Sequence, residues 1–279
     1  MKILVTGANG YLGTGVVKQL CEDGVEVTAV SKTTELVDSR AKRIDGDIFE
    51  FENPYKELGE PDIVLHMAWK KGFVHNDSIH IEELSKHYTF IKKMINGGVK
   101  KIAVIGTMHE VGFYEGSIKE NTPTNPESLY GIAKDAFRNM TKLMCKNANI
   151  NYQWLRGYYI VGNNEHGCSI FSKIAEAEKR GEKYFPFTSG MNQWDFIDYD
   201  MFCVQVATTV EQDTINGVIN ICSGRPEKLS DRVERFIKEN NYEIKLAYGK
   251  FPDRPYDSKA VWGDDDKIKK IMEMSGKNN

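Results

Sequence analysis

Tyr130 and Lys134 stand four residues apart in a stretch that predicts a helix beginning near Ser128, and this spacing puts both side chains on one face. A tyrosine has an ordinary pKa of about 10, which makes it a poor acid or base at neutral pH. A neighbouring ammonium group stabilises the phenolate and lowers that pKa. The pair is therefore a candidate for proton transfer, although the same spacing is also common in surface pairs.

Thr107 follows an apolar run over residues 101–106 that predicts a buried strand. Its hydroxyl would lie at the carboxyl edge of a parallel sheet, which is where ligands bind in open α/β folds. There it could hold a carbonyl oxygen beside Tyr130. A lone threonine at a strand end more often caps a turn, so this interpretation depends on the combination of Thr107 with Tyr130 and Lys134.

A glycine-rich turn follows the first predicted strand, residues 2–6, and opens a predicted helix over residues 11–23. Its first glycine permits the tight turn, the second lets the backbone approach a pyrophosphate, and the third lets the helix pack close to the sheet. This arrangement predicts a dinucleotide site rather than a merely structural turn. The residues expected to line the site are Gly7, Asn9, Gly10, Tyr11, Leu12 and Gly13.

The residues after the second predicted strand, 25–30, indicate which dinucleotide is bound. A carboxylate there would accept hydrogen bonds from the ribose 2′-hydroxyl, but the chain has Ser31 and Lys32. A hydroxyl and a cation suit a 2′-phosphate, so NADP is favoured over NAD, which stays possible; Lys32 could also be a solvated surface charge. Asp47 and Ile48, after a short run at residues 42–46, could hold the adenine.

Composition limits the class of protein. The chain has 279 residues, 41% hydrophobic and 28% charged, which is a globular balance. Its 37 Lys and Arg against 40 Asp and Glu give a net charge of −3, so no nucleic acid or membrane partner is expected. No apolar run reaches the roughly 18 residues that span a bilayer. Five scattered cysteines indicate reduced thiols, no metal site and a cytoplasmic location.

Short β-rich runs alternate with amphipathic helical stretches, which is typical of α/β proteins with a doubly wound parallel sheet. Further strands are expected at residues 62–66, 152–156 and 218–222, and further helices at residues 79–96, 128–146, 170–180 and 201–211. Residues 1–161 are expected to form a dinucleotide-binding domain that also receives about 195–224. A smaller substrate-binding lobe is expected from residues 162–194 and 225–279.

Several segments together resemble the extended short-chain dehydrogenases/reductases, the epimerase/dehydratase family that acts on nucleotide sugars. The likeness covers nearly the whole chain through TGANGYLG at 6–13, HMAW at 66–69, GTMHEVG at 106–112, ENTPTNPESLYGIAK at 120–134, WDFIDYD at 194–200 and GVINICSG at 217–224. The resemblance implies a Rossmann domain, a nicotinamide dinucleotide and a nucleotide-sugar substrate. It also implies a homodimer formed through the helices predicted at 79–96 and 128–146.

The resemblance implies roles for individual residues. Tyr130 would donate or accept the proton, Lys134 would support it and bind the nicotinamide ribose, and Thr107 would orient the substrate oxygen. The dinucleotide would also be lined by Met67, Ala68, Trp69 and Tyr158.

Departures from the family's pattern narrow the reaction. The family's 4,6-dehydratases follow the catalytic threonine with Asp and Glu, whereas this chain has Met108 and His109, so dehydration is not expected. His109 could donate a hydrogen bond to the substrate or act as an acid or base. Tyr159 and Trp194 replace an asparagine and an arginine that commonly reach the diphosphate, while Arg254 matches an arginine that clamps it. Contacts with substrate are thus expected from Thr107, His109, Tyr159, Trp194 and Arg254.

These features predict an NAD(P)H-dependent reductase of a nucleotide-linked 4-keto-6-deoxyhexose, such as dTDP- or CDP-4-dehydro-6-deoxyglucose. The alternative is a nucleotide-sugar 4-epimerase that retains NAD, in which the same groups oxidise and re-reduce C4. A third class, NADP-binding regulators without turnover, typically lacks the tyrosine and lysine. Tyr130 and Lys134 are both present, which favours an enzyme.

Overall fold

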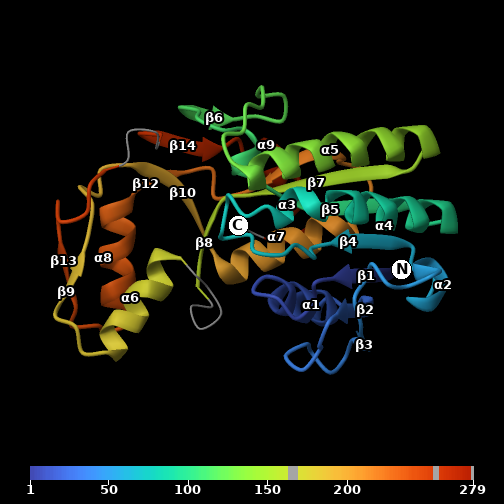
Figure 1. Cartoon of the computed structure of the whole chain (residues 1–279), viewed down its shortest axis with the longest axis horizontal. Helices are drawn as coiled ribbons and strands as arrows, with labels where there is room; N and C mark the ends of the chain where they lie inside the picture. The colour runs from blue at the N-terminus through green and yellow to red at the C-terminus, as the bar shows by residue number, and fades with distance from the viewer. Residues whose placement is uncertain (163–168, 254–257, 278–279) are drawn as a thin grey trace.

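The computed structural model describes residues 1–162, 169–253 and 258–277 of the chain. Within them a seven-stranded sheet, parallel throughout, has the order β11-β7-β5-β4-β1-β2-β3 (Figure 1). This confirms the predicted doubly wound α/β sheet. Its strands are β1 (Lys2–Thr6), β2 (Glu26–Ser31), β3 (Lys42–Asp45), β4 (Ile63–His66), β5 (Lys101–Thr107), β7 (Asn151–Gly157) and β11 (Gly217–Ile221).

The central strands are buried along their whole length, as expected for a parallel sheet covered on both faces. Alternate residues of β5 enter two separate cores. Ile102 and Val104 pack on one side of the sheet, and Ala103 and Ile105 pack on the other. This two-sided burial explains why the strands read as continuous apolar runs in the sequence.

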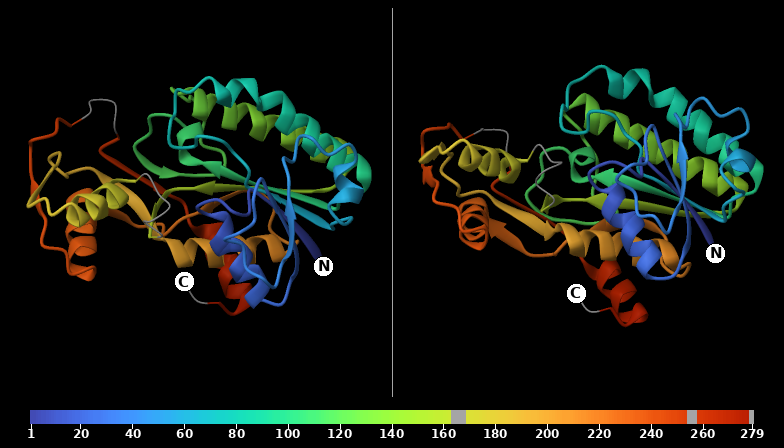
Figure 2. Two further views of the ribbon diagram at one scale, coloured as in Figure 1. Left: turned by 60° about the horizontal axis from the view of Figure 1, so that its bottom comes forward. Right: turned by 90° about the horizontal axis from the view of Figure 1, so that it is seen from below.

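Helices cover both faces of this sheet (Figure 2). One layer holds α1 (Gly13–Glu22), α7 (Tyr199–Glu211) and α9 (Asp266–Ser275), and the other holds α3 (Ile79–Glu82), α4 (Leu84–Gly97) and α5 (Leu129–Ala148). The short α2 (Pro54–Glu57) packs against α4. The single helix predicted over 79–96 is wrong in one respect, because Glu83 lies between α3 and α4 with a buried side chain that pairs with Lys70.

A second sheet extends from the carboxyl side of the first. It has the order β12-β10-β14-β6, with β8 paired to β10. Its strands are β6 (Gly116–Ile118), β8 (Tyr159–Val161), β10 (Gln193–Asp198), β12 (Pro226–Lys228) and β14 (Ala260–Gly263). Beyond it lie α6 (Ile170–Lys179), α8 (Leu229–Glu239) and the pair β9 (Tyr184–Pro186) and β13 (Lys245–Ala247), which share an aromatic core of their own (Figure 1).

Asp195 of β10 joins the two sheets. Its buried carboxylate accepts hydrogen bonds from Ser223 N at 2.8 Å, Ser223 Oγ at 2.7 Å, Gly224 N at 3.0 Å and Gly263 N at 3.1 Å. Thus one side chain holds the turn after β11 and strand β14 together. The last helix, α9, packs on α7 and β11 of the larger sheet. The predicted division into two domains stays a prediction.

Two further findings concern the described residues. None of their helices is long and apolar enough to cross a bilayer. Their cysteines, which are Cys21, Cys145, Cys203 and Cys222, are free thiols.

Candidate active site

The glycine turn is shaped by close contacts that larger side chains would block. Gly7 has φ +68°, and a Cβ there would lie 2.7 Å from Ala68 N, while a Cβ on Gly13 would lie 2.3 Å from Gly7 O. The N-terminus of α1 has no side-chain cap and no acidic residue in its first turn. The positive end of the helix dipole suits an anion. The turn therefore fits a dinucleotide pyrophosphate.

Two predicted cofactor residues hold loops around this turn. Asn9 accepts from Leu36 N at 2.8 Å and donates to Thr33 Oγ1 at 3.2 Å, which ties down the loop after β2. The Tyr11 hydroxyl donates to Gly162 O at 2.8 Å. The structure thus gives both side chains a role in shaping the turn.

Ser31, Lys32, Asp47 and Ile48 lie together at the carboxyl ends of β2 and β3. Lys32 Nζ is 3.3 Å from Asp47 Oδ2, so its charge is already paired with a carboxylate. Asp47 also accepts from Phe49 N at 3.1 Å. The Ile48 side chain packs in the core, with 6% of its surface exposed. A cavity of about 360 Å³ adjoins Asp47 and Ile48 and extends to Lys70, Glu83 and Lys86.

The structure brings Thr107, Tyr130 and Lys134 together. Thr107 ends β5, and Tyr130 lies in the first turn of α5, which Ser128 caps by accepting from Gly131 N at 3.1 Å. Thr107 lies close enough to Tyr130 for its hydroxyl to lower the pKa of the phenol. Lys134 Nζ, one helical turn further on, donates to Ile105 O at 2.8 Å. The three predicted catalytic side chains therefore meet at the carboxyl edge of the sheet.

Burial controls the protonation of these groups. It raises the pKa of the Tyr130 phenol well above its ordinary value, and the nearby Thr107 hydroxyl opposes this. It lowers the pKa of Lys134 to about 7, while the carboxylate of Glu110 acts in the opposite direction. Lys134 consequently changes its charge near neutral pH.

Aromatic and imidazole rings surround the Tyr130 phenol. His75, in the loop after β4, stacks on it with ring centroids 5.3 Å apart and an interplanar angle of 16°. The centroid of the His109 ring lies 4.4 Å from that of His75 and 6.2 Å from that of Tyr130. Burial, helped by His75, lowers the pKa of His109 to about 4, so His109 is neutral at pH 7. The rings of Trp69 and Tyr130 form a T-shaped pair, with centroids 6.3 Å apart and an interplanar angle of 71°.

No sequence pattern assigned a role to His75. The available signal was its place in the loop after a central strand, since such loops reach the ligand crevice. The His75–Asn76 segment of the loop is held against the start of α5, because Tyr130 N donates to His75 O at 2.8 Å and Leu129 N to Asn76 Oδ1 at 3.2 Å.

A buried ion pair supports the segment that carries His109. Glu110, the last residue of the short 3₁₀ helix η1 (Met108–Glu110), pairs with Arg156 of β7 at 2.6 Å, and both side chains have 0% exposure. Trp154 Nε1 donates to the same carboxylate at 2.9 Å. Burial raises the pKa of Glu110, and Arg156 opposes the rise. These contacts fix η1 directly after Thr107.

The predicted substrate residues lie in different surroundings. Tyr159 and Trp194 stack in the second sheet with centroids 4.6 Å apart and an interplanar angle of 11°, and Trp194 Nε1 donates to Ser258 O at 3.3 Å. Tyr158, predicted to border the nicotinamide, packs in the core beside Gly263, where an added Cβ would be 2.9 Å from Tyr158 Cζ. Arg254 lies outside the described residues.

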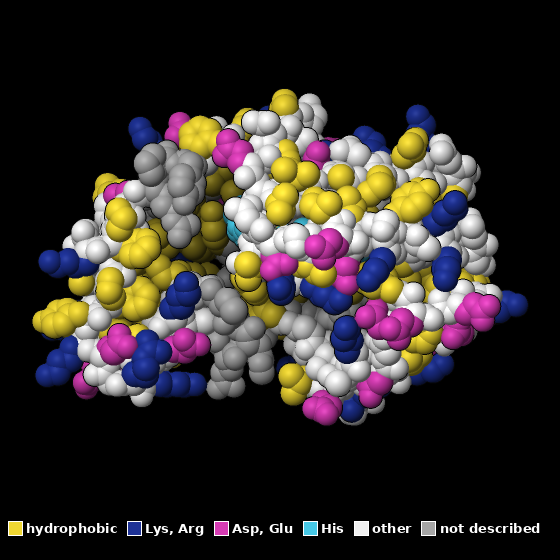
Figure 3. Space-filling view, in the orientation of Figure 1, with side chains coloured by type: hydrophobic (Ala, Val, Ile, Leu, Met, Phe, Trp, Pro, Cys, Tyr) yellow, Lys and Arg dark blue, Asp and Glu magenta, His cyan; other side chains and the backbone are white. Residues whose placement is uncertain are grey.

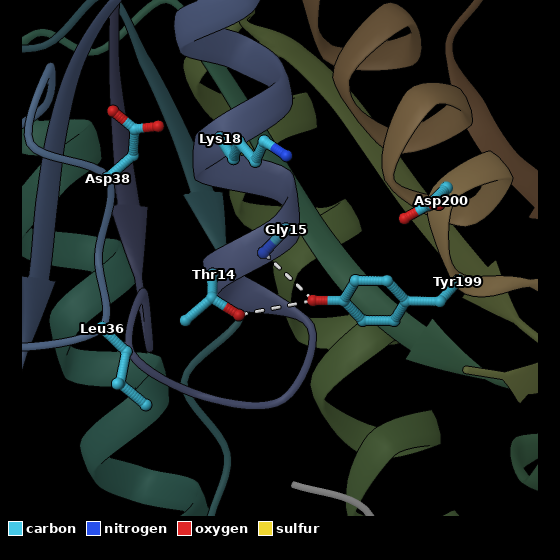
Figure 4. Close-up of a pocket in the computed structure, with 7 residues that line it drawn as sticks. All are labelled: Thr14, Gly15, Lys18, Leu36, Asp38, Tyr199 and Asp200. Atoms are coloured by element: carbon cyan, nitrogen blue, oxygen red, sulfur yellow. Dashed lines mark hydrogen bonds between the residues drawn. The ribbon is translucent and has the colours of Figure 1, made fainter. Parts of the chain in front are cut away.

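Figure 3 shows a hollow between the second-sheet lobe and the helices over the larger sheet, with histidine side chains at its rim. A cavity of about 500 Å³ lies elsewhere, where α1 meets the start of α7 (Figure 4). There the Tyr199 hydroxyl accepts from Gly15 N at 3.1 Å and donates to Tyr11 O at 2.7 Å. These bonds pack α1 against α7, and the cavity contains none of the predicted catalytic residues.

A family profile and several known proteins match this chain. The profile described as "NAD dependent epimerase/dehydratase family" matches residues 3–222. A "dTDP-6-deoxy-L-talose 4-dehydrogenase (NAD(+))" of Aggregatibacter actinomycetemcomitans is 42% identical over 94% of this chain and 99% of its own length. A "Putative UDP-arabinose 4-epimerase 4" of Arabidopsis thaliana is 24% identical over 99% and 72%.

Among solved structures, MoeE5 in complex with UDP-glucuronic acid and NAD has a TM-score of 0.83 and 21% identity, covering 98% of this chain and 93% of that one. DesIV, a dTDP-glucose 4,6-dehydratase from Streptomyces venezuelae with NAD and TYD bound, has a TM-score of 0.82 and 18% identity, covering 97% and 90%. At these identities the likeness concerns the fold.

Proposed function

The chain belongs to the NAD dependent epimerase/dehydratase family, whose members are NAD(P)-dependent enzymes of the extended short-chain type acting on nucleotide sugars, and within it we propose a 4-ketoreductase. The substrate would be a nucleotide-linked 4-keto-6-deoxyhexose, reduced to the 4-hydroxyl sugar. The relative named for dTDP-6-deoxy-L-talose supports a deoxysugar substrate and an oxidation or reduction at C4.

The meeting of Thr107, Tyr130 and Lys134 at the end of β5 is the observation that carries this proposal. Thr107 ends β5 and lies beside Tyr130, so both hydroxyls would contact the carbonyl oxygen at C4 of a bound sugar. Tyr130 donates its proton to that oxygen during reduction and takes it back during oxidation. Thr107 holds the same oxygen, and Lys134 favours the phenolate when it is charged. A bound nicotinamide dinucleotide supplies the hydride.

The residues of the glycine turn would hold the dinucleotide. Gly7 and Gly13 leave no room for a side chain, and the positive end of the α1 dipole would favour the pyrophosphate. Lys134, at the other end of the site, is the donor for the nicotinamide ribose. A dinucleotide held in this way would extend across the crevice at the sheet edge.

We propose NAD as the first cofactor to test, whereas the sequence analysis favoured NADP. The relative's name gives NAD(+), and the Lys32–Asp47 ion pair offsets the cation on which the NADP prediction depends. NADP binding requires Lys32 to leave Asp47 for the 2′-phosphate. The preference for NADP therefore stays a prediction that titration of Lys32 variants tests.

The residues after Thr107 argue against dehydration. That reaction needs an acid for the leaving hydroxyl and a base for the C5 proton, and the chain has Met108 and His109 at the corresponding positions. The next carboxylate, Glu110, is bound by Arg156 and Trp154 and has 0% exposure. These contacts support a reaction confined to C4.

Incubation with a panel of nucleotide 4-ketosugars and either NADH or NADPH tests the proposal. We expect loss of one reduced dinucleotide per product molecule, followed by absorbance, with product stereochemistry determined by NMR. A chain that isomerises the matching 4-hydroxyl sugars without net oxidation would be the alternative 4-epimerase.

A homodimer through α4 and α5 also stays a proposal. Several apolar residues of these helices, Ile91, Met94 and Phe137, are fully buried against the sheet. Others remain on the surface, with 44% exposure for Ile132 and 58% for Leu143. Figure 3 shows hydrophobic side chains along this face of α4 and α5. Sedimentation of wild type and Leu143→Glu measures whether this face forms the dimer. A reducing cytoplasm remains the expected location.

A further inference from the structure

The ammonium group of Lys134 is placed in an environment that disfavours charge. The side chain is 4% exposed, and Nζ donates to Ile105 O at 2.8 Å. Desolvation of a cation costs free energy unless nearby groups stabilise it. The groups around Nζ therefore decide whether Lys134 carries the charge that Tyr130 requires.

Trp69 faces this ammonium directly, with Nζ 4.0 Å from the centroid of its ring. The electron-rich face of an indole attracts a cation within about 6 Å, and the attraction is strongest when both groups are desolvated. Trp69 is partly buried among Phe137 and His87. The geometry is that of a cation–π contact in the interior.

Two histidines fix the direction of the indole ring. Trp69 Nε1 donates to His80 Nδ1 at 3.0 Å. His80 must then carry its proton on Nε2, which donates to Val74 O at 3.0 Å. The His87 imidazole stacks on the indole, with ring centroids 4.5 Å apart and an interplanar angle of 15°. The indole is thus held by a hydrogen bond at its edge and by stacking.

The titratable groups that face Lys134 in the described part of the chain do not replace this contact. His66 and His87 are buried, hydrogen-bonded to each other at 2.9 Å, and kept neutral by burial, which lowers both pKa values. Tyr130 is neutral by the same cause. The Glu110 carboxylate favours the ammonium, but Arg156 balances its charge at 2.6 Å.

We propose that Trp69 is a positioning residue that keeps the Lys134 ammonium charged and directed toward the catalytic centre through its ring face. Its importance for turnover rests on the proposed function, whereas the contact itself does not. The consequence is that the charge of Lys134 depends on the electron density of one indole ring.

Fluorinated tryptophans test this dependence, because fluorine withdraws electron density from the ring while changing its shape little. The protein is prepared with tryptophan and with mono-, di- and trifluorotryptophan. The pKa of Lys134 is measured from the Cε–Hε signals of ¹³C-labelled lysine, assigned with Lys134→Met. We expect the pKa to fall stepwise by about one pH unit across the series.

Trp69→Phe is the matched control, since the other tryptophans, including Trp154 beside Glu110, still take up the label. In this variant the pKa of Lys134 should not depend on fluorination. A constant pKa in the wild-type series, or an equal change in Trp69→Phe, would overturn the inference.

The titration needs neither substrate nor dinucleotide, so it remains informative if no nucleotide 4-ketosugar is reduced, a result that would refute only the proposed function. With an active enzyme, the alkaline limb of the kcat/KM profile should move to lower pH by the same amount as the pKa. A limb that does not move while the pKa does would show that the charge of Lys134 is not used in turnover.

Discussion

Replacement of Arg156 by methionine should make the stability of the protein strongly dependent on pH. The change leaves the Glu110 carboxylate without its partner in a place with 0% exposure. A buried unpaired carboxylate either stays charged at high cost or takes up a proton. The folded variant can protonate Glu110 instead of keeping its charge. The electrostatic penalty at any pH therefore cannot exceed the free energy of protonating an ordinary glutamate at that pH.

The limit follows from the pKa scale. An unfolded glutamate has the ordinary value of 4.5, and each pH unit above it corresponds to about 1.4 kcal/mol. The electrostatic loss in Arg156→Met is then at most about 3.4 kcal/mol at pH 7 and about 0.7 kcal/mol at pH 5. The sign is that of a raised folded-state pKa: the variant is least affected at low pH and loses stability as pH rises above 4.5.

Urea unfolding of wild type and Arg156→Met at pH 5, 6 and 7 measures this difference. The double variant Arg156→Met with Glu110→Gln is the control, because the amide accepts from Trp154 and cannot ionise. It should keep the loss of packing and lose the pH dependence. A free-energy difference that is the same at pH 5 and pH 7, or a pH dependence that survives Glu110→Gln, would refute the reasoning.

Three further predictions concern the site. Tyr130→Phe should lower kcat by at least about 100-fold with an unchanged dinucleotide Kd, because only the proton donor is removed; turnover near the wild-type rate would contradict the assignment. Lys32→Asp should weaken NADP binding by at least about tenfold, because the new carboxylate repels Asp47 and the 2′-phosphate, while the affinity for NAD changes little. Equal NADP titration curves for wild type and Lys32→Asp would show that Lys32 does not bind the 2′-phosphate. We predict that the His75 imidazole, which stacks on Tyr130, donates a hydrogen bond to the sugar. His75→Phe keeps the stacked ring but removes both ring nitrogens, so KM for the sugar should rise about tenfold at constant dinucleotide Kd. Val74→Thr, in the same loop, is the control, and matching KM values in the two variants would contradict this contact.

Strands buried on both sides could be predicted from the sequence, because their apolar runs are continuous. The run at 2–6 coincides with β1, and the run at 101–106 differs from β5 only by Thr107. The second sheet could not be predicted in this way. Strands such as β8 and β12 have three residues each, too few for a periodic pattern, and β10 pairs with segments more than 30 residues away along the chain.

In the site, too, local patterns could be predicted and contacts between distant segments could not. The meeting of Thr107 with Tyr130 and Lys134 follows from one strand end and one helical turn, both of which are local patterns. The ring of Trp69 over Lys134 depends on where a loop folds after β4, which the sequence does not encode locally. The predicted contact of Ile48 with adenine stays a prediction, and the sequence did not show that this side chain also packs in the core.

Asp195 has a consequence for engineering. Its four hydrogen bonds come from Ser223, Gly224 and Gly263, which belong to different segments of the chain. Gly224 has φ +71°, so its place in the turn favours glycine. A chimaera that takes its substrate lobe from another enzyme must import the aspartate, the Ser-Gly turn and the third donor as a set, or the graft introduces an unpaired carboxylate at the seam.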